Sequence, residues 1–422
     1  MTKYGLILVF CFSLFTVAAQ EKTFTPTQLE AIFLKQNLEL IAEQMNISIA
    51  DAEIVQAKLW ENPELSIGDV NLWTTEAQRE VLYEEIPNAP NTRQFTIELS
   101  QLITTAGKRR KEVATLKVSK EMAVQEFGEV LRELKTELRK SINEIIYFQQ
   151  YEIVLSKQVD VLGSLISAYE RQVAKGNFSR AEFLRLQASS LEMENELHQL
   201  RIELNSQLKT LRSLLHFPPE THIIIASDTN NKDIILPTLE DLYLLAAENR
   251  PDLKHQKLQT DFFAKTLRLE RAKRVPDITL NASYDRYAGL WRDYVGFGLS
   301  FDLPVFNRNQ GDIRVARLSM EQSKHLEQKI QNEVLNEISE AYTNYVQSLN
   351  FHRKISSSEL FLELDSMLEV YTRNLLNRNI SMLEFIDFME AYQTSKQIFL
   401  ETQKSVNDHF EELQYAIGID IK

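Results

Sequence analysis

The sequence predicts a mainly α-helical protein with a small β part, in which one structural motif occurs twice. The chain has only 11 glycines and 10 prolines, and no proline lies between Pro90 and Pro218 or after Pro304. Because proline destabilises a helix interior by about 3 kcal/mol, these two segments can hold long helices. Within them, apolar residues recur at coiled-coil spacing. Segments 202 positions apart also resemble each other, which indicates an internal duplication.

The N-terminus has the features of a secretory signal peptide at residues 1–19. Lys3 precedes an apolar run at 4–17, which ends in small residues at 17–19. That run is shorter than the roughly 20 residues that a membrane-spanning helix needs. Cleavage would remove Cys11, the only cysteine, so we expect no disulfide in the mature chain. No later segment offers a long uninterrupted apolar run, so the mature protein is expected to be soluble outside the cytoplasm or held in a membrane by strands.

Two pairs of strands are predicted from alternating apolar and polar residues. The expected strands cover about residues 63–73, 93–103, 277–287 and 294–304. In the first of them the alternation shifts phase at Gly68–Asp69, which predicts a β-bulge. Aromatic residues gather near the strand tips, where a membrane interface would suit them: Trp73, Tyr287, Trp291 and Tyr294.

Each predicted strand is about ten residues long, which is the length that crosses a bilayer when tilted. One face is apolar and the other polar, as in a barrel with a lipid-facing wall and a water-filled lumen. An ordinary antiparallel sheet packed on a core is the alternative interpretation. Four strands cannot close a barrel, and an open sheet edge in lipid is prohibitive. If the strands are in a membrane, the chain must therefore oligomerise: two copies supply eight strands and three supply twelve.

Two long helical hairpins are predicted, at about 105–215 and 310–417. Three apolar seams step by four and three residues, as coiled coils do. They comprise Leu155, Val159, Leu162, Ile166, Tyr169 and Val173; Leu197, Leu200, Leu204, Leu208, Leu211 and Leu215; and Leu360, Leu364, Met367, Tyr371 and Leu375. The stretch from Thr105 to Lys175 would measure roughly 100 Å as one helix.

The repeat is clearest at the turns of these hairpins. YERQVAKGNFSRAEFL begins at Tyr169, and YTRNLLNRNISMLEFI begins at Tyr371. The predicted organisation is a first repeat at 20–217, a connecting segment at 218–240 and a second repeat at 241–422.

Composition excludes several classes of function. A formal net charge of -13 makes nucleic acid an unlikely partner, because phosphates demand a basic face. The seven histidines form no HExxH motif and no cluster with metal-ligand spacing. Neither a phosphate-binding glycine loop nor a GxSxG motif occurs. We therefore expect no enzyme activity, no cofactor and no metal site.

Four segments together resemble the TolC-like family of outer-membrane efflux ducts, the outer membrane factors. They are ENPEL from Glu61, SQLITTAGKRR from Ser100, RPDLKHQ from Arg250, and LPVFNRNQGDIRVARL from Leu303. Each is loose alone, but together they are specific, and the resemblance covers nearly the whole mature chain. The last is most similar to the heavy-metal cation efflux branch. IGIDIK at the C-terminus does not resemble the aromatic-ended final strand of ordinary outer-membrane barrels.

The resemblance implies a homotrimer in the cell outer membrane with a large periplasmic portion. Its twelve strands would form a transmembrane β-barrel in outer-membrane lipid, and its antiparallel coiled coils an α-barrel tunnel. The implied partners are a periplasmic adaptor (membrane fusion protein) and an inner-membrane pump of the RND type. The implied function is passive export of heavy-metal cations or small toxic compounds by a tripartite efflux system. The alternatives are a type I secretion duct, a periplasmic coiled-coil scaffold or adaptor, and a secreted enzyme.

The resemblance also implies three sets of site residues. The hairpin tips would contact the adaptor, although they also suit ordinary turns: Gly176, Asn177, Phe178, Ser179, Arg378, Asn379, Ile380 and Ser381. Glu384 and Asp387 align with paired acidic residues at the periplasmic constriction and would form two carboxylate rings in a trimer; a solvated acidic helix face is the alternative. Strand-to-helix joints are expected at Gly107, Asn307, Asn309 and Gly311.

Overall fold

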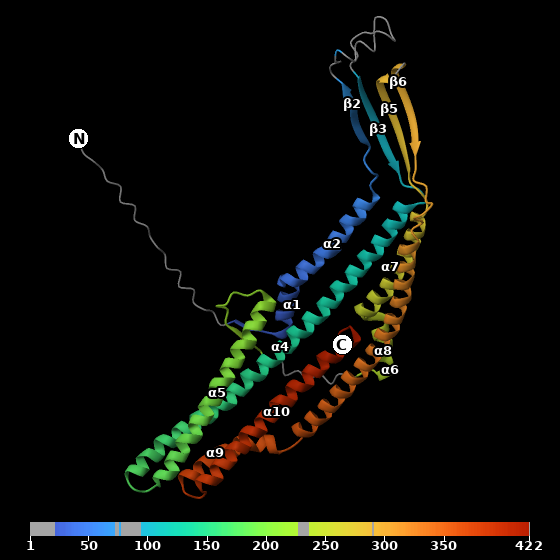
Figure 1. Ribbon diagram of the computed structural model, residues 1–422. Coiled ribbons are helices and arrows are strands. Elements are labelled where there is room, and N and C mark those ends of the chain that lie inside the picture. Colours follow the sequence, from blue (N-terminus) through green and yellow to red (C-terminus); the bar gives the residue numbers. More distant parts are fainter. Residues whose placement is uncertain (1–21, 72–75, 77–93, 227–235, 289–290, 422) are drawn as a thin grey trace, which may run out of the picture. The chain divides into compact units, whose positions relative to one another are not determined.

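The computed structural model describes residues 22–71, 76, 94–226, 236–288 and 291–421. These residues form two compact units (Figure 1). The first unit takes residues from Met1–Ile41, Leu131–Ala246 and Glu337–Lys422, and the second from Ala42–Val130 and Ala247–Asn336. The predicted signal peptide lies outside the described residues.

The fold is mainly helical with a small antiparallel β part, as the sequence predicts. In chain order the elements are β1 (Lys22–Phe24), α1 (Pro26–Gln36), α2 (Leu38–Lys58), β2 (Glu64–Asn71), β3 (Gln94–Ile103), α4 (Lys108–Ala174), α5 (Arg180–Leu215), β4 (Ile223–Ile225), α6 (Leu239–Asn249), α7 (Pro251–Lys273), β5 (Ile278–Ala288), β6 (Trp291–Ser300), α8 (Gln310–Ser356), α9 (Leu360–Leu376) and α10 (Met382–Ile417).

The second unit contains a four-stranded antiparallel sheet in the order β2-β3-β5-β6. Residues paired directly across neighbouring antiparallel strands lie on the same face. The register therefore gathers apolar side chains on one face: Leu65, Ile67, Ile97, Leu99, Leu280, Ala282, Tyr284, Val295, Phe297 and Leu299. The opposite face carries Ser66, Gly68, Thr96, Glu98, Ser100, Asn281, Ser283, Gly296, Gly298 and Ser300.

The apolar face is exposed in a single chain. Phe297 is 86% exposed, and Leu65 and Val295 are more than half exposed. Among the residues that the structure describes, neither β2 nor β6 has a second neighbour in this sheet, so both edges present unpaired backbone groups. A single chain thus leaves both an apolar face and two sheet edges uncovered.

The predicted bulge is confirmed, and the last strand lies earlier in the sequence than predicted. The register of β2 shifts between Gly68 and Asn71, and Asp69 adopts a positive φ of 48°. Strand β6 runs from Trp291 to Ser300 rather than from about 294 to 304, and β5 begins at Ile278, so it offers at most one residue beyond the Thr279–Ser300 pair. Trp73 lies outside the described residues, whereas Trp291 and Tyr294 are exposed.

The first unit is organised around helical hairpins. Helix α4 runs without interruption for 67 residues, and α5 packs back against it. The predicted seam positions Leu155, Leu162 and Tyr169 are buried, together with Leu197 and Leu200. Residues of α9 and α10 join the same core: Leu364, Leu368, Leu375, Phe385, Met389 and Tyr392.

The second proline-free segment contains three helices rather than two. Residues 357–359 separate α8 from α9, and residues 377–381 separate α9 from α10. The first interruption coincides with a run of serines, whose side chains compete for backbone hydrogen bonds. Ser357 Oγ donates to the carbonyl oxygen of Lys354 at 3.0 Å. This segment has no proline, so the proline pattern alone predicts no interruption there.

Two further features complete the first unit. A short parallel pair joins β1 to β4, with Phe24 opposite Ile225. Thr25 caps α1 through a capping box with Gln28. Within the described ranges, every helix is too short or too polar to cross a membrane.

Candidate functional site

The first strand-to-helix joint is held by a polar cluster in the second unit. Gly107 precedes α4 with a φ of 64°, a conformation that glycine adopts without strain. Lys108 Nζ lies 2.8 Å from Asp277 Oδ1, and the backbone N–H of Thr105 donates to the same oxygen at 2.8 Å. The Thr105 hydroxyl also donates to the carbonyl of Pro276. The joint therefore ties the end of β3 to the start of β5.

The second joint uses an asparagine where the sequence suggested a glycine. Gly311 lies inside the first turn of α8, whereas Asn309 takes the left-handed conformation with a φ of 56°. Asparagine tolerates this region because its short side chain hydrogen-bonds locally. Its Nδ2 donates to both the backbone carbonyl and the carboxylate of Glu270, at 2.9 and 2.7 Å. Asn307 Oδ1 accepts from the backbone N–H of Asn309 at 2.9 Å.

Asp277→Asn is expected to destabilise the purified protein by about 2 kcal/mol at pH 7, because Asp277 accepts charge-assisted hydrogen bonds. Burial acts to raise the pKa of Asp277, but Lys108 and Thr105 outweigh it and lower that pKa below 3.8. A carboxylate with a lowered pKa contributes stability above its unfolded pKa and loses it as the pH falls through the folded value.

The difference between wild type and Asp277→Asn should consequently be present at pH 7 and shrink below about pH 4. Thermal unfolding at pH 7 and below about pH 4, followed by intrinsic fluorescence, measures this difference in stability. Asp302→Asn is the matched control, because Asp302 is an exposed carboxylate of the second joint without an ion pair among the described residues. Equal losses in the two variants would contradict the role assigned to Asp277.

The hairpin tip between α4 and α5 closes through backbone hydrogen bonds. Gly176 has a φ of 73°, and its N–H donates to the carbonyl of Val173 at 2.9 Å. The N–H of Asn177 donates to the carbonyl of Gln172, also at 2.9 Å. This pair of bonds is the Schellman arrangement that ends many helices. Ser179 then begins α5 in a capping box with Glu182.

The tip between α9 and α10 repeats this geometry with different residues. Arg378 takes the left-handed position with a φ of 61°, and its N–H donates to the carbonyl of Leu375. The N–H of Asn379 donates to the carbonyl of Asn374 at 2.9 Å. Ser381 forms a capping box with Glu384. Both tips are thus well-formed turns in their own right.

The two tips also contact each other. The guanidinium carbon of Arg378 lies 4.5 Å from the ring centre of Phe178, a cation–π distance. Phe178 in turn packs on Tyr169, with ring centres 4.3 Å apart. Phe178 and Ile380 are half-buried against the helical core, whereas Asn177 and Asn379 are exposed. The surface that a partner can reach at the tips is therefore polar.

Glu384 and Asp387 both lie on the exposed side of the first turns of α10. Ser381 donates to the Glu384 carboxylate from its backbone N–H at 2.7 Å and from its hydroxyl at 2.9 Å. These bonds lower the pKa of Glu384 below its ordinary value. Asp387 has no ion pair among the described residues. Glu384 therefore caps the helix, and only Asp387 is free of a local structural role.

Sequence reasoning missed the Arg378–Phe178 contact and the capping role of Glu384. The serine three positions before Glu384 is a capping-box signal that could have indicated the second of these. Within the described ranges, no group of three or more histidine, cysteine, aspartate or glutamate side chains is arranged to hold a metal ion.

Comparison with known proteins gives a family and a fold. The family model for outer membrane efflux proteins matches residues 32–215 and 242–354. The chain is 23% identical over 280 residues to the cobalt-zinc-cadmium resistance protein CzcC of Cupriavidus metallidurans. That alignment covers 66% of this chain and 62% of CzcC, so it spans less than two thirds of that relative.

Solved structures share the fold at low identity. The structure of the transmembrane channel CusC superposes with a TM-score of 0.73 at 15% identity, covering 94% of this chain and 92% of that one. The Campylobacter jejuni outer membrane channel CmeC gives a TM-score of 0.75 at 13% identity, covering 93% and 85%. Since the family model matches well over half of the chain, the protein belongs to the outer membrane efflux protein family and is located in the outer membrane.

Proposed function

We propose that three copies of this chain form the outer-membrane exit duct of a tripartite efflux system. The observation that carries the proposal is the four-stranded sheet, which has an apolar face, a polar face and two unpaired edges. In lipid, unpaired backbone groups are prohibitive, so β2 of one subunit would pair with β6 of the next. Twelve strands then close a barrel with its polar face around the lumen.

The helices would continue this barrel as a periplasmic tunnel of antiparallel coiled coils. The proposal includes the internal duplication, with repeats at 20–217 and 241–422 joined by residues 218–240. It also includes a passive mechanism, in which a periplasmic adaptor and an inner-membrane pump of the RND type deliver the cargo. The likeness to CzcC, a cobalt-zinc-cadmium resistance protein, supports heavy-metal cations as cargo, with small toxic compounds as the second candidate.

A fractionation experiment distinguishes the duct from the alternative interpretation, a periplasmic coiled-coil scaffold. A barrel subunit stays in the membrane pellet through a carbonate wash and is released by detergent, whereas a coiled-coil scaffold is released by carbonate. Release by carbonate would refute the duct. The exposed apolar sheet face supports the barrel, because a scaffold leaves that face without a purpose.

The tips are proposed to contact the adaptor through their exposed residues. Asn177→Cys and Asn379→Cys should form crosslinks to the adaptor in intact cells, because both side chains point away from the helical core. Phe178→Cys should react less, because Phe178 packs between Tyr169 and Arg378. Absence of any adaptor adduct from Asn177→Cys and Asn379→Cys would contradict the contact.

Asp387 is proposed to form a carboxylate ring at the periplasmic constriction, with Glu384 as a second ring. Three converging carboxylates attract cations, so Asp387→Asn should lower cation selectivity and weaken block by polyvalent cations in a planar bilayer. Glu384→Gln changes both the ring and the helix cap. Its matched control is Glu182→Gln, which removes the equivalent cap where the chain has Arg185 in place of Asp387. Unchanged selectivity in Asp387→Asn would refute the ring.

A further inference from the structure

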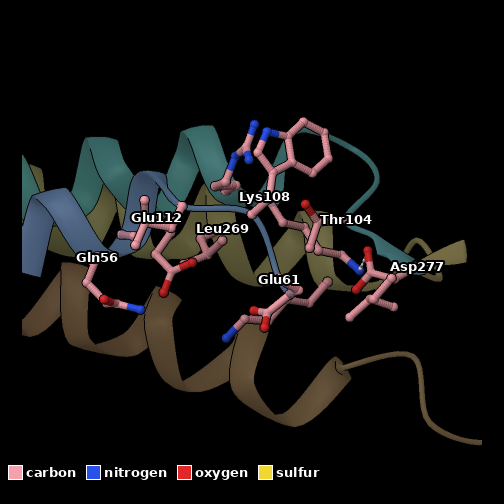
Figure 2. Close-up of a pocket in the computed structure, with 13 residues that line it drawn as sticks. Gln56, Glu61, Thr104, Lys108, Glu112, Leu269 and Asp277 are labelled. Carbon is pink, nitrogen blue, oxygen red and sulfur yellow. Dashed lines mark ion pairs between the residues drawn. The ribbon is translucent and has the colours of Figure 1, made fainter. Parts of the chain in front are cut away.

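A cavity of about 590 Å³ lies beside the first strand-to-helix joint. It is bounded by the end of α2, the start of α4 and the end of α7, all within the second unit. Figure 2 shows the Lys108–Asp277 ion pair on one side of it and Gln56 and Glu112 toward the other, with Glu61 between them. Its volume is in the range that small-molecule sites occupy.

Among the described residues, one cation in this cavity has no counter-ion. Lys108 is paired with Asp277, and Lys273 with Glu270 at 2.7 Å. The guanidinium carbon of Arg109 instead lies 3.9 Å from the ring centre of the Trp60 indole. Arg109 Nη1 is buried and has no hydrogen-bond partner in the described part of the chain. A buried guanidinium N–H without an acceptor is unfavourable, and a ligand carboxylate would satisfy it.

Two carboxylates in the same cavity are also available. Glu61 and Glu112 are exposed, and neither forms an ion pair within the part of the chain that the structure describes. These two negative charges outnumber the one positive charge of Arg109, so the cavity has a small excess of negative charge. A purely anionic ligand would be repelled by them, whereas a ligand that also carries a primary ammonium would be attracted.

Gln56 and Thr104 add polar groups to the remaining wall, and the rest of it is apolar. Trp60 is 61% exposed and Leu59 57% exposed, and Leu102 and Leu269 also line the cavity. An aromatic or aliphatic body of the ligand could cover these surfaces and remove them from water.

The sheet register decides between a lipid and a water-soluble ligand. Leu102 pairs with Thr279, and Thr279 pairs with Ser300, so the three side chains share the polar face. A neighbouring cavity contains all three residues and shares Lys108 and Asp277 with this one. Under the proposed function, on which this step rests, the polar face surrounds the lumen. The cavity therefore opens towards soluble cargo rather than lipid.

We propose that this cavity binds a small amphipathic zwitterion of the amino-acid type. The ligand carboxylate would accept hydrogen bonds from Arg109, its ammonium would lie near Glu61 and Glu112, and its apolar body would cover Trp60 and Leu59. The duct wall would then recognise some of the molecules that pass through it.

Three probes of matched shape test the charge pattern: phenylalanine has both charges, 3-phenylpropanoate has only the carboxylate and 2-phenylethylamine only the ammonium. Binding to the full-length detergent-solubilised protein is followed by the fluorescence of Trp60, after Trp73→Phe and Trp291→Phe remove the other two indoles. Phenylalanine should bind most tightly. Arg109→Gln should weaken it roughly tenfold or more, as loss of a charge-assisted hydrogen bond does.

Two variants separate the roles of the charges. Glu112→Gln should reduce the preference for phenylalanine over 3-phenylpropanoate, while Arg110→Gln should leave all three affinities unchanged, because Arg110 is exposed and lies outside the cavity. Equal binding of the three probes, or binding unaffected by Arg109→Gln, would overturn the proposal. So would displacement of the probe by phospholipid vesicles, which would indicate a lipid site. Conductance of the same preparation in a planar bilayer tests the duct separately, so a conducting protein that binds no probe would refute this inference alone.

Discussion

Phe297→Arg is expected to prevent assembly of the protein in the outer membrane. Phe297 lies near the middle of β6 and is the most exposed residue of the apolar sheet face, at 86%. An arginine on the lipid face near the bilayer midplane destabilises a barrel by about 3 kcal/mol. A trimer carries that change three times. Immunodetection of trimers in the detergent-solubilised membrane fraction measures the loss.

Gly298→Arg is the matched control. Gly298 is the next residue of the same strand, and its side chain would point to the opposite, polar face. A Cβ at this position would meet its nearest neighbour, Asn281 Cβ, at an ordinary 3.6 Å. Trimers should therefore persist in Gly298→Arg. Equal loss in both variants would mean that the two faces do not differ in environment, which contradicts the barrel.

The second large effect is expected at Arg139, which lies at the centre of an ionic cluster in the first unit. Its guanidinium contacts Glu30 at 3.0 Å, Glu411 at 2.9 Å and Asp420 at 2.9 Å. Lys135 contacts Glu30 and Asp420 as well. The cluster therefore joins α1, α4 and α10 to the residues that follow α10.

Arg139→Gln should destabilise the protein by about 3 to 4 kcal/mol at pH 7, because it removes the counter-charge of Glu411 and leaves Glu30 and Asp420 to share Lys135. Burial raises the pKa of Glu411 even with Arg139 present. A carboxylate whose folded pKa is raised binds its proton more readily in the folded state, so its contribution to stability falls as the pH rises through that window. Acidification towards pH 5 should therefore restore part of the lost stability, as thermal unfolding would show.

Arg201→Gln provides the comparison, since Arg201 forms an exposed ion pair with Glu152 at 2.7 Å. Exposed pairs contribute less than about 1 kcal/mol. Similar losses of stability in the two variants would contradict the proposed role of the cluster. So would a further loss of stability of Arg139→Gln, relative to wild type, on acidification.

The elements with strong periodicity could be predicted from the sequence. Alternation identified all four strands of the sheet and their apolar faces, and the phase shift at Gly68–Asp69 located the bulge. Heptad spacing placed Leu155, Leu162 and Tyr169 in the core. In each case the apolar pattern repeats over enough residues that single exceptions do not obscure it.

Other features arise from contacts that no local pattern encodes. Strands β1 and β4 pair across about two hundred residues of sequence, and three residues are too few to show alternation. Met367 was predicted in the seam but is 39% exposed, whereas its neighbour Leu368 is buried. The Arg109–Trp60 and Arg378–Phe178 contacts join separate segments through side chains that also suit a solvated surface.

The assembled barrel requires β2 of one subunit to lie beside β6 of another, and disulfide trapping measures this directly. Ser66→Cys in β2 is combined in turn with a cysteine at Gly296, Gly298 or Ser300 in β6, all on the polar face. We expect no background crosslinks from native cysteines, because the only one, Cys11, is predicted to be removed with the signal peptide. At least one pair should give oxidised bands of two and three linked subunits and none larger. Monomeric bands alone from all three pairs, in protein recovered from the outer membrane, would contradict the shared barrel.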